Sequence, residues 1–265
     1  MIDVMYRQAE VASGPFDVVV RVRGRAEAVD ELASWQGPRL RHGDLARVVA
    51  SRRDDLYVFD SATSSFVEVR PWLGDESLLT TWEHDRARGD HMLSRCRGVD
   101  LRKVVVAACE CVRPALRFSS PDDRRPAAAI DTALRWSRGA ADGAAADRAA
   151  AAAAVSVTAT QAADVARSNA AYAATCVAYA AARAASYAMD SSDVDLARDC
   201  VDLAARSVRL AADAELYGNE VGGVAACSAA LYLAARVVRE HVPLSVLACS
   251  LVGISDPLPF RVARR

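Results

Sequence analysis

The chain has 265 residues, a formal net charge of −1, 52% hydrophobic residues and 25% charged residues. This composition excludes an intrinsically disordered chain, and the near-neutral charge argues against a general nucleic-acid binder, which would carry a basic excess. Alanine fills 56 positions, most of them after residue 106. Because alanine is the best helix former and lets helices approach closely, the composition predicts tightly packed helices.

No segment has the pattern of a membrane span or a secretion signal. The longest uncharged stretches have 15 residues, whereas a helical span needs about 20 apolar residues. These stretches are Ala149–Ala163, Ser168–Ala182 and Val221–Ala235. The first 13 residues lack the basic start and apolar core of a signal peptide. We therefore expect a cytoplasmic protein that does not bind a membrane.

The first 75 residues predict a small α+β unit. Phe16–Arg23 is rich in β-branched residues, Arg25–Trp35 has helical spacing, and Leu45–Ala50 is apolar but of undecided type. Two further strand-like runs, Leu56–Asp60 and Phe66–Arg70, lie on either side of a polar segment. This pattern predicts a hairpin near residues 56–70, with Pro71 ending its second strand.

Residues 76–265 predict an all-helical bundle. A capping-box pattern at Thr80–Glu83 opens a helix towards His91 and Leu93, and Asp100 can cap the next helix, which Pro114 should end. Pro126 suits the first turn of a helix that stops at Gly139. The helices expected after it are Asp142–Ala163, Asp164–Met189, Ser191 or Ser192 to Leu216, Glu220–Glu240 and Leu244–Leu251.

The expected fold class is therefore mainly α, an Ala-rich multi-helix bundle with a small N-terminal α+β unit. Helices should dominate from about residue 80 to 252, and strands should be confined to the first 75 residues. A strand at Val104–Val106 or Val155–Val157 would contradict this fold. Trp136 should lie buried against the Asp100–Leu116 helix as part of the core.

The cysteines and histidines give little support for a metal site. The seven cysteines are odd in number and include no Cys-x-x-Cys pair, so we expect free thiols packed as small hydrophobes. His84 and His91 are seven residues apart and would share a helix face, with Asp85 and Cys96 as further ligands. Gly89 interrupts that segment, and the spacing matches no known metal motif. We expect solvated or helix-end histidines and no metal or other cofactor.

An acidic cluster occupies the start of the helix that follows residue 192. Its members are Asp190, Asp193, Asp195 and Asp199. Acidic residues in the first turn of a helix compensate the positive end of its dipole, which is the ordinary explanation of such a cluster. The alternative is a surface that recognises a basic partner.

The most specific motif is D-x-R-P-x-x-A-I-x-x-A-x-x-W-x-x-G, which runs from Asp123 to Gly139. An amphipathic helix that begins at Asp100-Leu101-Arg102 precedes it, and long Ala-rich helices follow it. This order resembles the Ala-rich helical immunity proteins of bacterial polymorphic-toxin systems over about residues 98–240. The resemblance implies an all-helical protein that neutralises a toxin by binding it. Members of that family often carry histidine in the later helices, where this chain has Cys176 and Cys227.

Asp123 and Arg125 are the candidate site residues within this motif. Asp123 can accept hydrogen bonds from the first turn of the helix that begins at Pro126. The guanidinium of Arg125 can reach a carboxylate on a neighbouring helix, such as Glu110 or Asp131. In this structural interpretation the pair fixes how the helix enters the bundle. The alternative is a ligand site, because charges beside a helix N-terminus also suit anion binding.

Three functional hypotheses follow from the sequence. The chain lacks a nucleophile elbow, a Walker loop and a dinucleotide fingerprint, which disfavours an enzyme. We therefore expect a protein that neutralises a cognate toxin by protein–protein contact. The alternatives are an enzyme or accessory subunit in peptide or natural-product biosynthesis, and a helical adaptor. The expected partner is a protein, such as a toxin, rather than nucleic acid or a membrane, and a homo-oligomer is left open.

Overall fold

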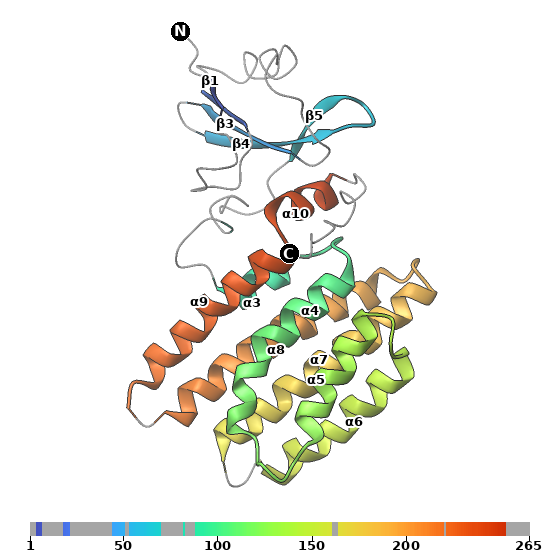
Figure 1. The fold of residues 1–265 in the computed structure, drawn as a ribbon, viewed down its shortest axis with the longest axis vertical. Helices are drawn as coiled ribbons and strands as arrows, with labels where there is room; N and C mark the ends of the chain where they lie inside the picture. The colour runs from blue at the N-terminus through green and yellow to red at the C-terminus, as the bar shows by residue number, and fades with distance from the viewer. Residues whose placement is uncertain are drawn as a thin grey trace, which may run out of the picture. The chain divides into compact units, whose positions relative to one another are not determined.

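The computed structural model describes residues 4–6, 18–21, 44–50, 53–69, 82, 88–160, 164–219 and 221–252. The chain divides into two compact units, one formed by residues 1–83 with 243–265 and the other by residues 84–242. The described residues are mainly helical and the strands lie in the first unit (Figure 1). The expected fold class, a multi-helix bundle with a small α+β unit, is confirmed. Val104–Val106 and Val155–Val157 both lie in helices.

The first unit contains a five-stranded sheet with the strand order β1-β2-β3-β4-β5. The β2–β3 pair is parallel, and the other three neighbouring pairs are antiparallel. Leu45–Ala50, whose type the sequence left undecided, is a strand, and the helix expected at residues 25–35 lies outside the described residues. The strands are β1 (Val4–Tyr6), β2 (Val18–Arg21), β3 (Leu45–Ala50), β4 (Arg53–Asp60) and β5 (Ser65–Val69).

Strands β4 and β5 form a hairpin at the place where the sequence predicts one. The Asp60 carboxylate organises the turn, because it accepts hydrogen bonds from the Ala62 N–H and the Thr63 hydroxyl, both at 2.9 Å. Across the hairpin the rings of Phe59 and Phe66 meet edge to face, with centroids 5.3 Å apart. These local contacts therefore stabilise the hairpin turn, which lies at the polar segment where the sequence predicts it.

The C-terminal helix α10 (Leu244–Leu251) packs on β4 and belongs to the first unit. The sequence placed residues 76–265 in the bundle, whereas the described residues from Pro243 to Val252 belong to the first unit. The physical reason is that α10 is apolar on most of its surface, with Leu244, Val246 and Leu247 all buried. Such a helix needs an apolar surface to cover, and one face of a sheet provides it.

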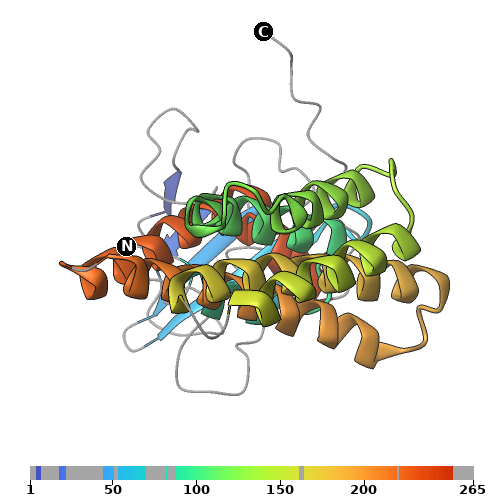
Figure 2. The same cartoon turned by 90° about the horizontal axis from the view of Figure 1, so that it is seen from below.

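The second unit consists of helices in two layers. Consecutive helices α6, α7, α8 and α9 are neighbours in one layer, and α3, α4 and α5 pack across them. In Figure 2 the green helices α4 and α5 lie along one side of this unit and the orange α8 along the other. The helices are α3 (Gly89–Ser94), α4 (Leu101–Val112), the 3₁₀ segment η1 (Arg113–Phe118), α5 (Arg125–Ser137), α6 (Gly143–Thr160), α7 (Val165–Met189), α8 (Val194–Gly218) and α9 (Gly223–His241).

Local side chains fix where these helices begin and end. The Asp100 carboxylate accepts a hydrogen bond from the Arg102 N–H at 3.0 Å, as expected of an N-cap. Pro114 lies two residues after the last residue of α4, Val112, and the chain continues there as the 3₁₀ segment η1. Gly139 follows α5 with φ +73°, a left-handed conformation that suits glycine. The residues predicted for the Thr80–Glu83 capping box lie outside the described residues, apart from Trp82.

Alanine fills the centre of the bundle. Ten alanines of α7 are buried, and Ala178 meets Ala129 of α5 and Ala150 and Ala153 of α6 in one cluster. The helices approach so closely that a Cβ added at Gly89 would lie 2.5 Å from the Ala234 Cβ. The sequence suggested that Gly89 interrupts a helix. It is the first residue of α3 and packs directly against α9. No helix in the described ranges has both the length and the apolar character to cross a bilayer.

All seven cysteines are free thiols, and six of them are buried. Burial raises the pKa of the thiols of Cys96 and Cys200 to about 12. These thiols stay protonated near neutral pH and pack as small apolar groups.

We predict that Trp136→Ala lowers the free energy of unfolding by about 3–5 kcal/mol, as expected for truncation of a core aromatic side chain. Trp136 is 8% exposed on α5, which packs against α4, α6 and α7. Urea unfolding followed by circular dichroism measures the change. The neighbouring exposed Arg135→Ala is the control and should change stability by less than about 0.5 kcal/mol. Equal effects of the two substitutions would contradict a core role for Trp136.

Candidate functional site

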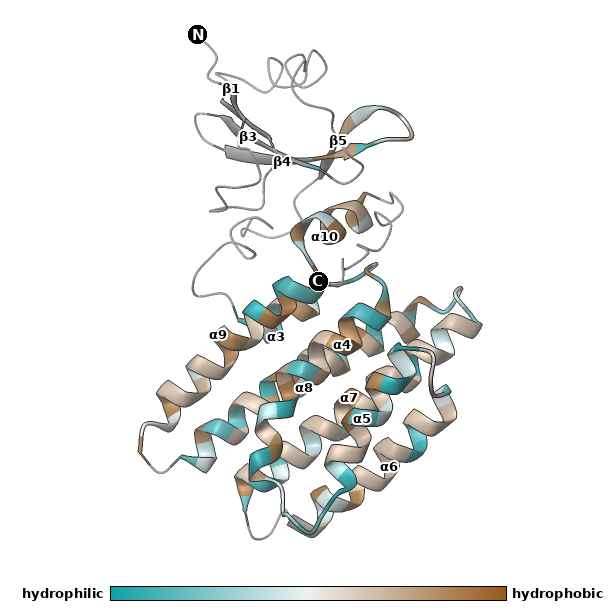
Figure 3. Ribbon diagram, viewed as in Figure 1, coloured by the Kyte–Doolittle hydropathy of each residue, from teal (hydrophilic) through white to brown (hydrophobic). Residues whose placement is uncertain are grey.

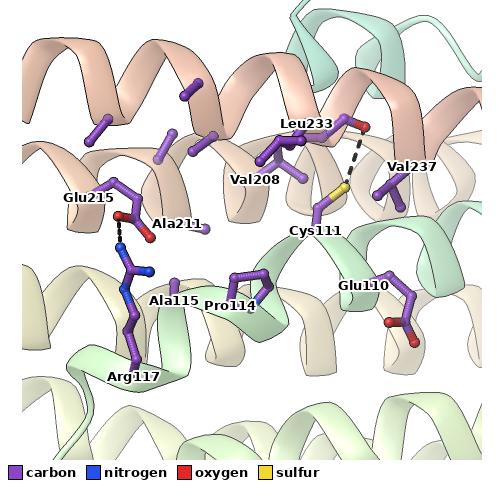
Figure 4. A pocket seen from close by; sticks show the side chains of 15 residues that line it. Glu110, Cys111, Pro114, Ala115, Arg117, Val208, Ala211, Glu215, Leu233 and Val237 are labelled. Carbon is purple, nitrogen blue, oxygen red and sulfur yellow. Dashed lines mark hydrogen bonds and ion pairs between the residues drawn. The ribbon is translucent and has the colours of Figure 1, made fainter.

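An apolar groove of about 320 Å³ lies in the helical unit. Its floor is α8, and its walls are α9 on one side and the α4–η1 segment on the other (Figure 4). Most of the lining side chains are alanine, valine and leucine, so the groove offers apolar surface to an occupant. The lining residues are Glu110, Cys111, Pro114, Ala115, Arg117, Val208, Ala211, Ala212, Glu215, Ala226, Ala229, Ala230, Leu233, Ala234 and Val237.

Pro114 accounts for the opening of this groove. Helix α4 packs on α8 and α9 as far as Val112, and Pro114 then prevents its continuation as a regular helix. The η1 segment that follows is packed against α7 and α8, whereas α9 continues past it for several turns. The alanines of α9 are too small to fill the space that results. The groove is therefore a product of one proline and a row of short side chains.

An ion pair closes one end of the groove. The Glu215 carboxylate, whose side chain is 10% exposed, accepts a hydrogen bond from Arg117. The Asn219 side-chain amide donates a second hydrogen bond to it at 3.3 Å. Arg117 also lies over the ring of Phe118, with its guanidinium carbon 4.8 Å from the ring centroid. A carboxylate is thus held at the edge of an apolar surface by an arginine that is 59% exposed.

Cys111 lies on the wall of the groove near its other end. Its S–H donates to the Ala234 carbonyl of α9 at 3.6 Å, a contact visible in Figure 4. Burial raises the pKa of this thiol to about 12, with the nearby Glu110 carboxylate adding to the effect. A nucleophilic cysteine must form a thiolate near neutral pH. The Cys111 thiol therefore stays protonated near neutral pH, and its hydrogen bond joins α4 to α9.

Asp123 and Arg125 bind one another at the start of α5. The Asp123 carboxylate accepts from the Arg125 backbone N–H at 3.1 Å and from its guanidinium at 2.8 and 2.9 Å. These bonds hold the pKa of Asp123 below its usual range, and the nearby Ser156 hydroxyl of α6 adds to the effect. Helix α5 begins at Arg125, and its N-cap residue, Arg124, makes no side-chain capping bond. Asp123 caps the helix instead, from two residues before its first residue.

The expected contact of Arg125 with Glu110 or Asp131 is replaced by a different arginine. Arg113 lies 4.0 Å from Glu110 and 3.9 Å from Asp131, so it joins α4, η1 and α5. The reason is distance along the chain, since Asp123 is only two residues from Arg125 and its carboxylate already occupies the guanidinium. Neither Asp123 nor Arg125 lines the groove.

The four aspartates of the acidic cluster lie together where α7 gives way to α8. Asp193 is the N-cap of α8 and accepts from the N–H groups of Asp195 and Leu196. The Asp190 carboxylate accepts from the Ser192 hydroxyl at 2.6 Å, which holds the pKa of Asp190 below its usual range. Asp195 pairs with Arg198 at 2.9 Å, and Asp199 is exposed. Capping and local pairing account for three of the four, and recognition of a basic partner stays a hypothesis.

The start of α8 also borders a smaller cavity of about 220 Å³. Its polar lining includes Arg97, Tyr187 and Arg198, and Arg198 is the residue that pairs with Asp195. Because the Asp195 carboxylate already pairs with Arg198, this arginine contributes less positive charge for binding an anion in the cavity. The larger groove is the better candidate site.

The histidines do not form a metal centre in the described part of the chain. His91 is exposed on α3, and His84 lies outside the described residues. Among the described residues, no group of three or more His, Cys, Asp or Glu side chains is placed to hold a metal ion.

Sequence reasoning missed the residues that line the groove. Arg117 and Glu215 are 98 positions apart, so nothing in their local sequence indicates that they meet. Two signals did exist. Pro114 interrupts a helical pattern, and Val221–Ala235 carries no charge although much of it is exposed.

Comparison with protein-family models, with curated proteins and with solved structures finds no match to this chain.

We predict that Asp123→Ala lowers the free energy of unfolding by about 1 kcal/mol at pH 7, because α5 loses its cap. The pKa of Asp123 is lower in the folded chain than its unfolded value near 4, so its carboxylate stabilises the fold above about pH 4. That contribution is lost as the pH falls from about 4 through the lowered folded pKa. Urea unfolding at pH 7 and at pH 3 should therefore show a smaller difference from wild type at the lower pH.

The exposed neighbour Asp122 is the matched control, and Asp122→Ala should change stability by less than about 0.5 kcal/mol. Arg125→Ala should lower stability in the same direction as Asp123→Ala. Variants at 123 and 125 that melt like wild type but lose binding of a partner would make this loop the functional site instead.

Proposed function

We propose that the helical unit is a protein-binding module that neutralises a cognate toxin by taking one helix of that partner into the groove between α4–η1, α8 and α9. The observation that carries this proposal is the groove itself, an open apolar cavity of about 320 Å³ on the surface of a soluble bundle. Open apolar grooves on protein surfaces are often interaction sites.

An amphipathic helix is the occupant that the dimensions favour. The lining residues of α9 run from Ala226 to Val237, a length of about 16 Å at 1.5 Å per residue. Three turns of a partner helix have that length, and apolar side chains spaced three and four residues apart would face the floor of the groove. The alanines of α8 and α9 allow the backbone of the occupant to lie close to both helices.

The charges at the ends of the groove favour an occupant with a basic side chain. Glu110 lines one end with a side chain 39% exposed, and Glu215 lines the other. The counter-charge of Glu215 comes from Arg117, which is more than half exposed and belongs to the short η1 segment. A lysine or arginine of the partner would share Glu215 with Arg117, or Glu110 with Arg113, which adds specificity more than affinity.

The resemblance to immunity proteins supports the choice of a toxin as the partner. That resemblance covers about residues 98–240, and every residue that lines the groove lies within this range. An immunity protein must bind its toxin and needs no catalytic group, in agreement with a site built of alanine, valine and leucine.

Filling the groove tests the proposal. Ala230 lines the groove and is partly exposed, so Ala230→Trp should block it without disturbing the buried core. We expect this substitution to weaken binding of the proposed toxin partner by more than tenfold in isothermal titration calorimetry. It should also abolish protection when the two proteins are co-expressed in a growth assay.

The matched control is Ala151→Trp, which places the same side chain on an exposed position of α6 far from the groove lining. It should leave both binding and protection unchanged, and both variants should melt within about 2 °C of wild type. Wild-type affinity of the Ala230→Trp variant would refute the groove as the binding site. Absence of binding by wild type would refute the choice of partner.

A further inference from the structure

The outer face of α9 is an exposed apolar stripe. The turn before the helix exposes Val221 at 94% of its surface, and the helix exposes Val224 at 74% and Leu233 at 54%. Small residues lie between these larger ones and are also exposed. We call this set the α9 stripe, and its members are Val221, Val224, Ala225, Ser228, Ala229, Tyr232, Leu233 and Arg236.

The α9 stripe differs from an ordinary solvated helix face in its lack of charge. No Asp, Glu, Lys or Arg occurs between Val221 and Ala235, and Arg236 is the first charged residue. The ribbon coloured by hydropathy shows α9 white to brown over most of its length (Figure 3). Helix α9 is also the end of the layer formed by α6, α7, α8 and α9, so its outer face has no neighbouring helix of that layer.

We propose that the α9 stripe is the contact between two copies of this chain, which pack with their α9 helices antiparallel about a two-fold axis. The axis passes between Ser228 and Ala229. The stripe shares Ala229 and Leu233 with the lining of the groove, so this interface borders the proposed toxin site and adds self-association to the properties of the helical unit.

The positions of the stripe residues carry this proposal, because the stripe is complementary to itself. With the axis between residues 228 and 229, a helical residue of one copy lies opposite the residue of the other copy for which the two residue numbers add up to 457. Val224 then faces Leu233 of the other copy, and Ala225 faces Tyr232. Each pair joins two apolar side chains, and the second pair places a large ring over a small residue. A contact of this kind is what a closed two-fold dimer requires.

The centre and the ends of the stripe agree with the same arrangement. Ser228 faces Ala229 at the axis, where two small side chains let the helices approach to about 8 Å. At the ends, Arg236 lies level with the turn that precedes α9 of the other copy, so the two guanidinium groups lie on opposite rims. No pair of like charges is brought together, and the charged end of each helix stays at the solvated edge of the contact.

The exposed area sets the strength to be expected. The large side chains of the stripe present apolar surface on the order of 500 Å² in each copy. A stable interface of standard size buries about 800 Å² on each partner. The dimer should therefore be reversible, with a Kd in the micromolar range, about 1–100 µM.

Sedimentation velocity over protein concentrations from about 1 to 300 µM tests the association of the full chain. Wild type should change from monomer to dimer across this range. Val224→Glu places two carboxylates in the contact and should raise the dimer Kd at least tenfold. Val155→Glu is the matched control, because Val155 is an exposed valine of α6 at 53% exposure outside the stripe, and it should leave the Kd unchanged. Val224 and Val155 do not line the groove, so toxin binding should survive both substitutions.

A cysteine placed at the axis tests the register. Ser228→Cys brings two thiols close to one another across the two-fold and should give a disulfide-linked dimer under mild oxidation. Val221→Cys is the control, because its counterpart in the other copy lies at the far end of the stripe, and it should crosslink at the low level of wild type. A chain that stays monomeric at 300 µM, a dimer that Val224→Glu leaves intact, or equal crosslinking at 221 and 228 would each overturn the proposal.

Discussion

The contact of one alanine-faced helix with another is the constraint on which the helical unit depends. An alanine side chain extends one carbon beyond the backbone, so helices that meet through alanine lie closer than helices separated by leucine or phenylalanine. Close approach multiplies weak dispersion contacts between backbones and compensates for the small apolar area that each alanine buries. It also leaves little tolerance, as at Gly89 and Gly143, where an added Cβ would collide with Ala234 and Ala185.

Close packing also determines where the surface opens. Short side chains fill the space between helices only where the backbones stay in contact, and they leave a hollow where the backbones diverge. Such a divergence occurs after Pro114, and the hollow is bordered by α8 and α9. The polar pair of Arg117 and Glu215 lies where the hollow ends, and there Gly218 makes room for the Phe118 ring. The groove is thus a consequence of the same packing that stabilises the core.

Sequence patterns predicted the parts of this structure that depend on neighbouring residues. Asp100 and Gly139 act where they are placed in the chain, so the ends of α4 and α5 could be predicted from local chemistry. The α10 helix was predicted at its observed bounds, but its place beside β4 was not, because a short apolar helix can cover any apolar face. The pairing of Arg113 with Asp131 and of Arg117 with Glu215 depends on how distant helices meet, which no local pattern contains.

Burial of the free thiols protects the folded protein against oxidation. Thiolate is the form that reacts with oxidants and with other disulfides, and the buried thiols of the bundle are kept both protonated and out of reach. Unfolding would expose all of them at once on a single chain. Non-native disulfides would then form in competition with refolding. In an oxidising solution the lifetime of the active protein is therefore set by its rate of unfolding and not by its equilibrium free energy of unfolding.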